Sequence, residues 1–150
     1  MRLPRLAMIA AAAGGLAALG HAPFGLLPVS LVGFAALVWA VSRSDGARRA
    51  SAMVAWIAGT AYFAVALHWI VEPFLVDVAR HGWMAPFALI LLAAGLAVFW
   101  GVAGWLAGAG SASRRAITFA VAMALAEFAR GTVLSGFPWA LPAYVWIEWP

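Results

Sequence analysis

Long uncharged stretches alternate with short polar ones along the whole chain. No acidic or basic residue apart from histidine occurs in residues 6–42, 50–71, 81–113 or 131–147. About 20 apolar residues in a helix cross a hydrocarbon core roughly 30 Å thick, so each stretch is as long as a membrane span or nearly so. The pattern therefore predicts an all-α, polytopic membrane protein.

The polar and helix-breaking residues between these stretches predict a bundle of about five transmembrane helices. Two glycines and a proline within 20–25 interrupt the helical pattern, so we expect the chain to turn there and re-enter the membrane. Polar residues mark the later loops. The expected helices are 6–20, 26–42, 50–71, 83–106 and 116–135. They form a helical bundle over 1–136, followed by a Pro- and aromatic-rich interfacial segment at 137–150 on the periplasmic side.

The N-terminus allows a second interpretation. Two arginines followed by an Ala-rich run have the layout of a secretory signal peptide. Gly20, His21 and Ala22 make a poor cleavage site, and Pro23 directly after it argues against processing. We interpret this stretch as a short first membrane helix.

Composition supports a membrane setting and excludes several kinds of site. The chain is 67% apolar and only 9% charged, whereas soluble domains are about half apolar and a quarter charged. Its nine basic residues are all arginine and are dispersed in ones and twos, which favours a topology signal over nucleic-acid binding. Cysteine is absent, so disulfides, thiolate metal sites and a cysteine nucleophile are excluded from this stretch.

Arginine is distributed unevenly over the expected loops. The N-terminal tail and the second and fourth loops together hold seven arginines, whereas the first and third loops hold only Arg80. Because basic residues are retained on the cytoplasmic side, we expect a cytoplasmic N-terminus. Tryptophans are expected in interfacial belts at both ends, with Trp69, Trp83, Trp139, Trp146 and Trp149 outside and Trp39, Trp56, Trp100 and Trp105 inside.

Two charged residues interrupt the last expected helix. A charge in hydrocarbon costs about 2.5 to 3.5 kcal/mol on insertion scales unless it is paired or hydrated. Glu127 and Arg130 are three residues apart and therefore share one helical face. They are interpreted either as a structural ion pair or as a site that faces lipid head groups or substrate, since an arginine near the outer interface can bind a phosphate.

Residues 137–150 are apolar but contain three prolines and four aromatic rings besides Phe137. A plain helix is excluded by the prolines. Irregular backbone at membrane depth is tolerated where protein or a water-filled cavity satisfies it, so this segment is expected to line a groove at the outer interface. Interfacial anchoring by tryptophan and tyrosine alone is the alternative.

Two further chemistries are weakly indicated. A metal site is arithmetically possible with the spacing of His68, Glu72, Asp77 and His81. Loop histidines and acids beside a membrane are usually solvated, however. Ser135 before Gly136 faintly resembles the serine of rhomboid proteases, without the expected motif or a histidine base. No metal, no other cofactor and no catalytic residue is expected in this stretch.

The residues from Glu127 to Tyr144 resemble a family signature. Glu127 and Arg130, then the run from Ser135 to Trp139, and then Tyr144 are similar to the Glu-x-x-Arg, Thr-Gly-Phe-Pro-Trp and Tyr pattern of apolipoprotein N-acyltransferases. Serine stands at 135 where the family has threonine, and residues 141–143 depart from its usual glycine before tyrosine. More loosely, residues 22–25 and 68–70 resemble the family's first periplasmic turn and third-helix exit.

The resemblance implies an enzyme of lipoprotein biosynthesis in the bacterial inner membrane, with its active side periplasmic. Such enzymes take an acyl chain from a glycerophospholipid onto a cysteine, then pass it to the N-terminal diacylglyceryl-cysteine of an apolipoprotein. Their cysteine, glutamate and lysine lie in a periplasmic nitrilase-like domain. Because this chain has neither cysteine nor lysine, we expect it to be the N-terminal transmembrane portion and inactive by itself.

The partners implied are the phospholipid acyl donor, the apolipoprotein substrate and membrane lipids. We expect a lipid or substrate groove shaped by Glu127, Arg130, Phe137, Pro138, Trp139 and Tyr144. A non-enzymatic membrane carrier, channel subunit or assembly factor, in which Glu127 and Arg130 gate a polar path, is the alternative.

Overall fold

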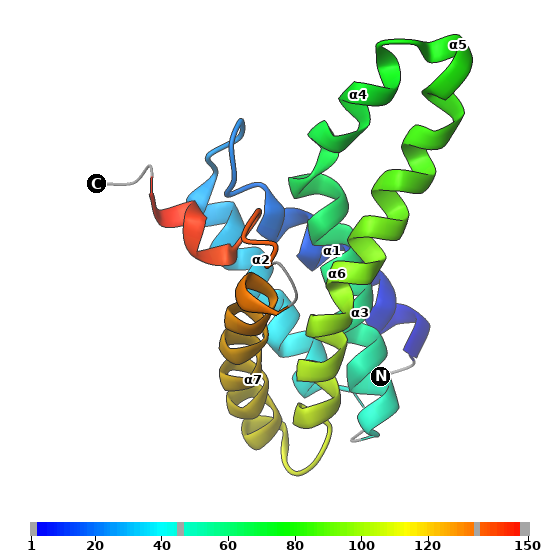
Figure 1. Cartoon of the computed structure of the whole chain (residues 1–150). Helices are drawn as coiled ribbons and strands as arrows, with labels where there is room; N and C mark the ends of the chain where they lie inside the picture. The colour runs from blue at the N-terminus through cyan, green and yellow to red at the C-terminus, as the bar shows by residue number, and fades with distance from the viewer. Residues whose placement is uncertain (1–2, 45–46, 134–135, 148–150) are drawn as a thin grey trace.

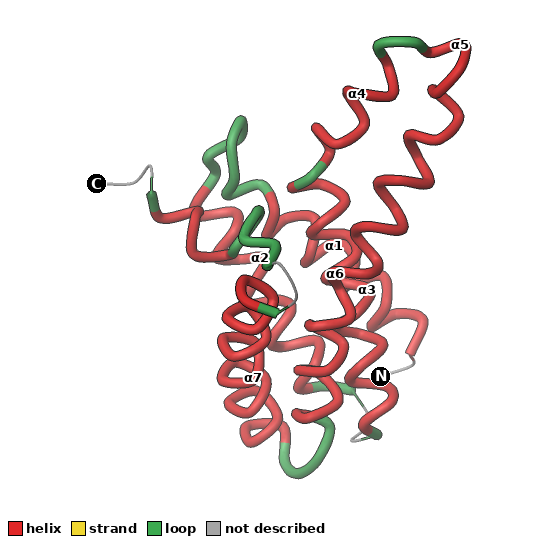
Figure 2. The backbone as a smooth tube through the Cα atoms, in the orientation of Figure 1, coloured by secondary structure: helices red, strands yellow, loops and turns green. Residues whose placement is uncertain are grey.

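The protein is a bundle of five long helices. The computed structural model describes residues 3–44, 47–133 and 136–147. The long helices are α1 (Leu3–Ala18), α2 (Leu27–Ser42), α3 (Arg48–Ala66), α6 (Ala85–Ala107) and α7 (Ala112–Thr132) (Figure 1). No strand occurs in the described part of the chain (Figure 2). The expected all-α class is confirmed.

Shorter helical turns connect or follow the long helices. They are η1 (His68–Val71), α4 (Glu72–Leu75), α5 (Val78–His81), η2 (Gly82–Met84) and η3 (Pro142–Trp146). By length and composition, Arg48–Ala66 and the continuous helical stretch Val78–Ala107 can each span a membrane, while α1 and α2 are shorter apolar helices.

The structure differs from the expected helix 50–71 and the expected loop 72–82. The α-helix ends at Ala66, and four residues of 3-10 helix follow it. Pro73 has no N–H to donate to the carbonyl of Trp69, so a straight α-helix cannot continue through this point. The chain then forms α4 and α5 instead of an open loop, and the Asp77 carboxylate accepts a hydrogen bond from the Arg80 backbone N–H at 3.3 Å to begin α5.

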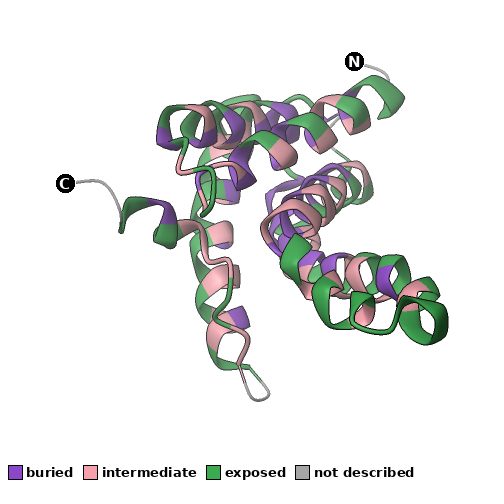
Figure 3. Cartoon of the chain, turned by 90° about the horizontal axis from the view of Figure 1, so that it is seen from above, coloured by how far each residue is buried: buried purple, intermediate pink, exposed green. Residues whose placement is uncertain are grey.

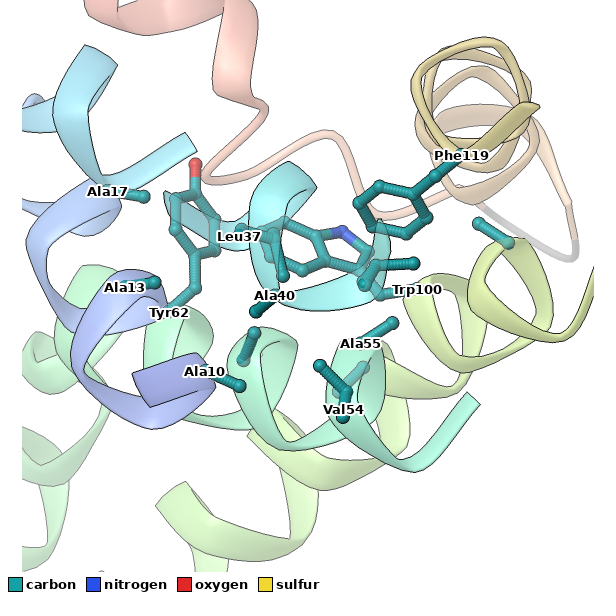
Figure 4. Packing of buried hydrophobic residues seen from close by; sticks show 14 of the residues in the cluster. Ala10, Ala13, Ala17, Leu37, Ala40, Val54, Ala55, Tyr62, Trp100 and Phe119 are labelled. Atoms are coloured by element: carbon teal, nitrogen blue, oxygen red, sulfur yellow. The ribbon is translucent and has the colours of Figure 1, made fainter. Parts of the chain in front are cut away.

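The long helices pack in a ring, in the order α1, α3, α6, α7, α2 and back to α1. Seen from above, buried residues lie on the inner faces and exposed residues on the outer faces (Figure 3). Aromatic rings fill the centre: the Tyr62 and Trp100 ring centroids are 4.9 Å apart, and Trp100 lies between Tyr62 and Phe119 (Figure 4).

The two ends of the bundle differ in chemistry. The arginine-rich end carries the connections after α2 and α6, and the opposite end carries the turn at 19–26, the α4–α5 hairpin and residues 136–147 (Figure 1). At the arginine-rich end, Arg115 Nε donates to the Ser42 carbonyl at 3.1 Å, and Arg115 Nη1 donates to the Gly110 carbonyl at 3.1 Å. A cation at the last carbonyls of α2 is favourable because the helix dipole is negative there.

Small residues let the helices approach closely. A Cβ added to Gly14 would lie 2.0 Å from the Ala58 carbonyl oxygen, so only glycine fits where α1 crosses α3. Gly104 is equally constrained, because its added Cβ would lie 2.5 Å from the Ser51 carbonyl oxygen. Close backbone approach is typical of helix pairs in membranes, where dispersion rather than water exclusion holds helices together.

Adjacent glycines of α1 provide a matched test of this packing. Gly14→Ala should lower the thermal unfolding midpoint measured by circular dichroism in detergent micelles, because overpacking costs about 1 to 3 kcal/mol. Gly15→Ala should leave it unchanged or raise it slightly, since nothing lies within 4 Å of its added Cβ. Equal effects of the two substitutions would contradict the α1–α3 contact.

Candidate functional site

A buried ion pair forms the centre of the site at the end of α7. Arg130 Nη2 lies 2.6 Å from Glu127 Oε2, and Arg130 Nε donates to Glu127 Oε1 at 3.4 Å. Arg130 is only 1% exposed. Their three-residue spacing places both side chains on one face of the same helix, as expected. The pair therefore meets the condition under which charges are tolerated in an apolar interior.

The remaining donors of Arg130 hold the segment that follows α7. Arg130 Nη1 donates to the carbonyls of Phe137 at 2.7 Å and Trp139 at 2.9 Å, and Nη2 donates to Ala140 at 3.4 Å. A guanidinium has five N–H donors, and five hydrogen bonds to Arg130 are formed. Arg130 thus supplies hydrogen bonds to the carbonyls of the irregular segment 137–140, which has no helical partners for them.

Two neighbouring helices contribute to the same network. Trp100 Nε1 on α6 donates to Glu127 Oε1 at 2.6 Å. The Arg130 guanidinium carbon lies 4.8 Å from the centroid of the Phe63 ring on α3, a cation–π contact. The interfacial position expected for Trp100 is wrong: its side chain is fully buried, because the helix face that carries it points into the ring and Glu127 accepts its N–H.

Tyr62 and His21 extend the network to the first turn. The Tyr62 hydroxyl donates to the Ala140 carbonyl at 3.1 Å, and His21 Nε2 lies 2.5 Å from that hydroxyl. A hydroxyl has one proton, so the neutral His21 ring donates its Nε2–H to the Tyr62 oxygen when Tyr62 donates to Ala140. Neither Tyr62 nor His21 had a sequence signal, because their partners are 41 and 78 residues away.

The backbone of the segment turns sharply next to Arg130. Gly136 has φ +72°, and Ala140 has φ +53°. A Cβ on Gly136 would lie 2.4 Å from the Gly131 carbonyl oxygen, so this position requires glycine both for its conformation and for its close approach. The Phe137 N–H donates back to the Arg130 carbonyl at 3.0 Å. The turn therefore folds the segment back onto the end of α7.

An apolar groove of about 520 Å³ lies beside the ion pair, between α2, α7 and η3. Glu127 is its one charged lining residue. The groove is lined by Leu31, Phe34, Ala120, Met123, Ala124, Glu127, Phe128, Leu141, Pro142, Ala143, Val145 and Trp146.

The six residues expected to shape a groove occupy different places. Only Glu127 lines this groove; Tyr144 lines a smaller cavity of about 230 Å³ together with His21. Arg130 and Phe137 lie inside the network, and Pro138 is exposed. Trp139 is 57% exposed, and its ring centroid lies 6.0 Å from that of Trp69 in η1.

The weaker candidates are not assembled. No group of three or more metal-ligating side chains occurs among the described residues, so the set from His68 to His81 does not form a metal site there. Ser135 lies outside the described residues.

The fold and the site together define a helical domain with helices long and apolar enough to span a membrane, in which an ion pair fixes the irregular segment 137–140. A model of the apolipoprotein N-acyltransferase N-terminal domain matches residues 13–150. The chain belongs to the apolipoprotein N-acyltransferase family and corresponds to its N-terminal domain.

Individual relatives agree with this assignment. The chain is 48% identical over 147 residues to the apolipoprotein N-acyltransferase of Caulobacter vibrioides, covering 95% of this chain and 27% of that protein. It is 36% identical to that of Rhodopseudomonas palustris, covering 95% of this chain and 28% of the relative. With that of Brucella melitensis it shares 36% identity over 93% of this chain and 28% of the relative. The chain thus spans little more than a quarter of the length of these relatives.

His21 makes the network sensitive to pH. Burial lowers the pKa of His21 below its usual 6.5, and the positive charge of Arg130 lowers it further. The folded state therefore binds a proton on His21 more weakly than the unfolded chain does. The stability that neutral His21 contributes to the fold is fully present above pH 6.5. It is lost as the pH falls through 6.5 towards the lower pKa of His21 in the folded state.

We predict that His21→Gln reduces the acid sensitivity of the fold. The thermal unfolding midpoint of the wild-type chain should fall between about pH 7.5 and about pH 5, because protonation of His21 opposes folding. The fall should be smaller in His21→Gln, which lacks the titrating ring. His81→Gln serves as the control, since His81 lies in exposed α5. Identical pH profiles for wild type and His21→Gln would contradict the assignment.

Proposed function

We propose that this chain is the membrane domain of an apolipoprotein N-acyltransferase and that its outer groove holds the acyl chain of the glycerophospholipid donor. The observation that carries the proposal is the apolar groove between α2, α7 and η3, with the Glu127 carboxylate in its wall. The family supplies the reaction class, N-acyl transfer to an apolipoprotein, and the resemblance implies that the acceptor is its N-terminal diacylglyceryl-cysteine.

The groove has the chemistry that an acyl chain needs. Its volume of about 520 Å³ is within the usual range of ligand pockets, about 300 to 1,000 Å³. Its lining is almost wholly aliphatic and aromatic, so it binds hydrocarbon without leaving polar groups unpaired. Phe128, which is 73% exposed, lies at its edge on α7, where lipid would surround the bundle.

Arg130 acts in this proposal as a positioning residue. Its five hydrogen bonds all go to protein groups, which favours a role in holding residues 137–140 over direct binding of a phosphate. Those residues lead directly into η3, the wall of the groove. Phe137 and Pro138 belong to this support, while Trp139 and Tyr144 offer exposed rings at the outer interface.

The chemistry itself requires groups that this chain lacks. It has no cysteine and no lysine, so the thioester step that the resemblance implies needs residues outside it. We propose that the domain is inactive when alone. Its bundle, residues 1–136, lies in the bacterial inner membrane, and the segment 137–150 faces the periplasm. The acyl donor and the apolipoprotein are its proposed partners.

A chimera tests the groove. We predict that residues 13–150, placed in the matching part of the Caulobacter vibrioides relative, support N-acylation of an apolipoprotein, measured by mass spectrometry. Ala124→Trp fills the groove and should lower the rate by roughly tenfold or more. Trp139→Ala and Arg130→Ala should lower it as well.

Val121→Trp is the matched control, because Val121 is exposed on α7 and does not line the groove. If Ala124→Trp acylates as fast as Val121→Trp in equally folded chimeras, the acyl chain is not held there. If both Trp139→Ala and Arg130→Ala left the rate of acyl transfer unchanged, the proposed role of residues 137–140 in shaping the groove would be contradicted.

The orientation of the bundle can be tested separately. The chain has no native cysteine, so labelling of a single introduced cysteine shows on which side of the membrane that residue lies. With the N-terminus in the cytoplasm, a membrane-impermeant maleimide added from the periplasmic side should label Val76→Cys, which is 89% exposed before α5. It should not label Ala109→Cys, which is exposed between α6 and α7. The reverse labelling pattern would invert the proposed topology.

A further inference from the structure

A second groove lies at the arginine-rich end, on the outer face of α3 and α6. Its volume is also about 520 Å³, and it shares no lining residue with the first groove between α2, α7 and η3. Its lining is apolar apart from one guanidinium. The lining residues are Arg49, Ala52, Met53, Trp56, Val98, Gly101, Val102 and Trp105.

The hollow exists because Gly101 has no side chain between two tryptophans. A Cβ added to Gly101 would lie 3.4 Å from the Trp56 Cβ, an ordinary contact, so the backbone at this position accepts a side chain, and Gly101 lines the groove. Trp56 is held in place, since its Nε1 donates to the Ala94 carbonyl at 3.0 Å. The groove is therefore bounded by a fixed ring.

Positive charge is concentrated at one end of this groove. The Arg48 guanidinium carbon lies 4.5 Å from the centroid of the Trp105 ring. Arg49 is exposed, lines the groove and has no ion pair or hydrogen bond from its guanidinium within the part of the chain that the structure describes. From Arg49 to Trp56 the helix rises about 10 Å, at 1.5 Å per residue, which gives an apolar channel that begins at an exposed guanidinium.

We propose that this groove binds one anionic glycerophospholipid, with its phosphate on Arg49 and the first part of an acyl chain between Trp56 and Trp105. Guanidinium groups bind phosphate oxygens through paired N–H donors. Basic pockets between membrane helices on the cytoplasmic side are typical lipid head-group sites. The site requires the membrane setting but not acyl transfer, and it is distinct from the outer groove.

Charge complementarity favours a lipid over a second copy of the chain. A copy docked in this groove would have to bring a carboxylate to Arg49. Of the three carboxylates among the described residues, Glu72 and Asp77 lie at the opposite end of the bundle, and Glu127 is paired with Arg130; Asp45 and Glu148 lie outside the described residues. An anionic lipid supplies the missing charge together with the hydrocarbon.

Native mass spectrometry of the detergent-purified chain tests the proposal. Dioleoyl phosphatidylglycerol should bind more tightly than dioleoyl phosphatidylcholine, which has the same acyl chains. Arg49→Gln should weaken phosphatidylglycerol binding by roughly tenfold. Arg114→Gln, the same change at an exposed arginine away from the groove, should leave the affinity within about twofold, as expected for a surface charge. Gly101→Leu should abolish binding, and Gly95→Leu, on an open face of α6, should not.

Several results would overturn the proposal. One is equal binding of the two lipids by the wild-type chain. Another is an equal loss of affinity in Arg49→Gln and Arg114→Gln. Full binding by a folded Gly101→Leu chain would place the lipid elsewhere. A dimer that Gly101→Leu disrupts, without any lipid preference, would show that a second copy occupies the groove. Acyl transfer by the chimera described above is unaffected by any of these outcomes, so the two proposals fail separately.

Discussion

The ion pair between Glu127 and Arg130 is the constraint on which the end of the bundle that carries residues 136–147 depends. A charge inside an apolar bundle is tolerated only when it is paired and its donors are satisfied. Arg130 meets this condition by binding Glu127 and three backbone carbonyls at 137, 139 and 140. The same bonds satisfy backbone groups that prolines and a sharp turn leave outside any helix. The same hydrogen bonds thus offset both the cost of burying the charge and the cost of burying irregular backbone.

This interaction connects parts of the chain that are distant in sequence. Trp100 binds Glu127 from α6, and Tyr62 binds the Ala140 carbonyl from α3. His21 contacts Tyr62 and brings the first turn into the same network. The wall of the outer groove begins one residue after Ala140. The proposed acyl-chain groove between α2, α7 and η3 is therefore positioned by the polar network, and Glu127 is the one member of that network in its otherwise apolar lining.

Much of this architecture could be predicted from local patterns, and some could not. Charge-free stretches predicted the all-α class, and the spacing of Glu127 and Arg130 predicted a shared face. The change from α-helix to 3-10 helix after Ala66 was not predicted, because the expected helix 50–71 is uniformly uncharged and has no glycine or proline near its end. Trp100 was placed at an interface by counting along the chain, which does not reveal which face of α6 points inward. The prolines and aromatic rings after 136 predicted that this segment lines a groove, but the other walls come from α2 and α7, whose approach to it no local pattern could predict.

The central claim is that Arg130 fixes η3 beside α7, and a distance across the groove tests it most directly. Spin labels on cysteines at Met123 and Ala143, which lie on α7 and η3 on opposite sides of the groove, can be measured by double electron–electron resonance in lipid nanodiscs. We expect one narrow distance distribution in the otherwise wild-type chain and a broad one in Arg130→Gln, with Arg114→Gln remaining narrow. A distribution equally narrow in Arg130→Gln, or broad in the wild-type background, would contradict the account.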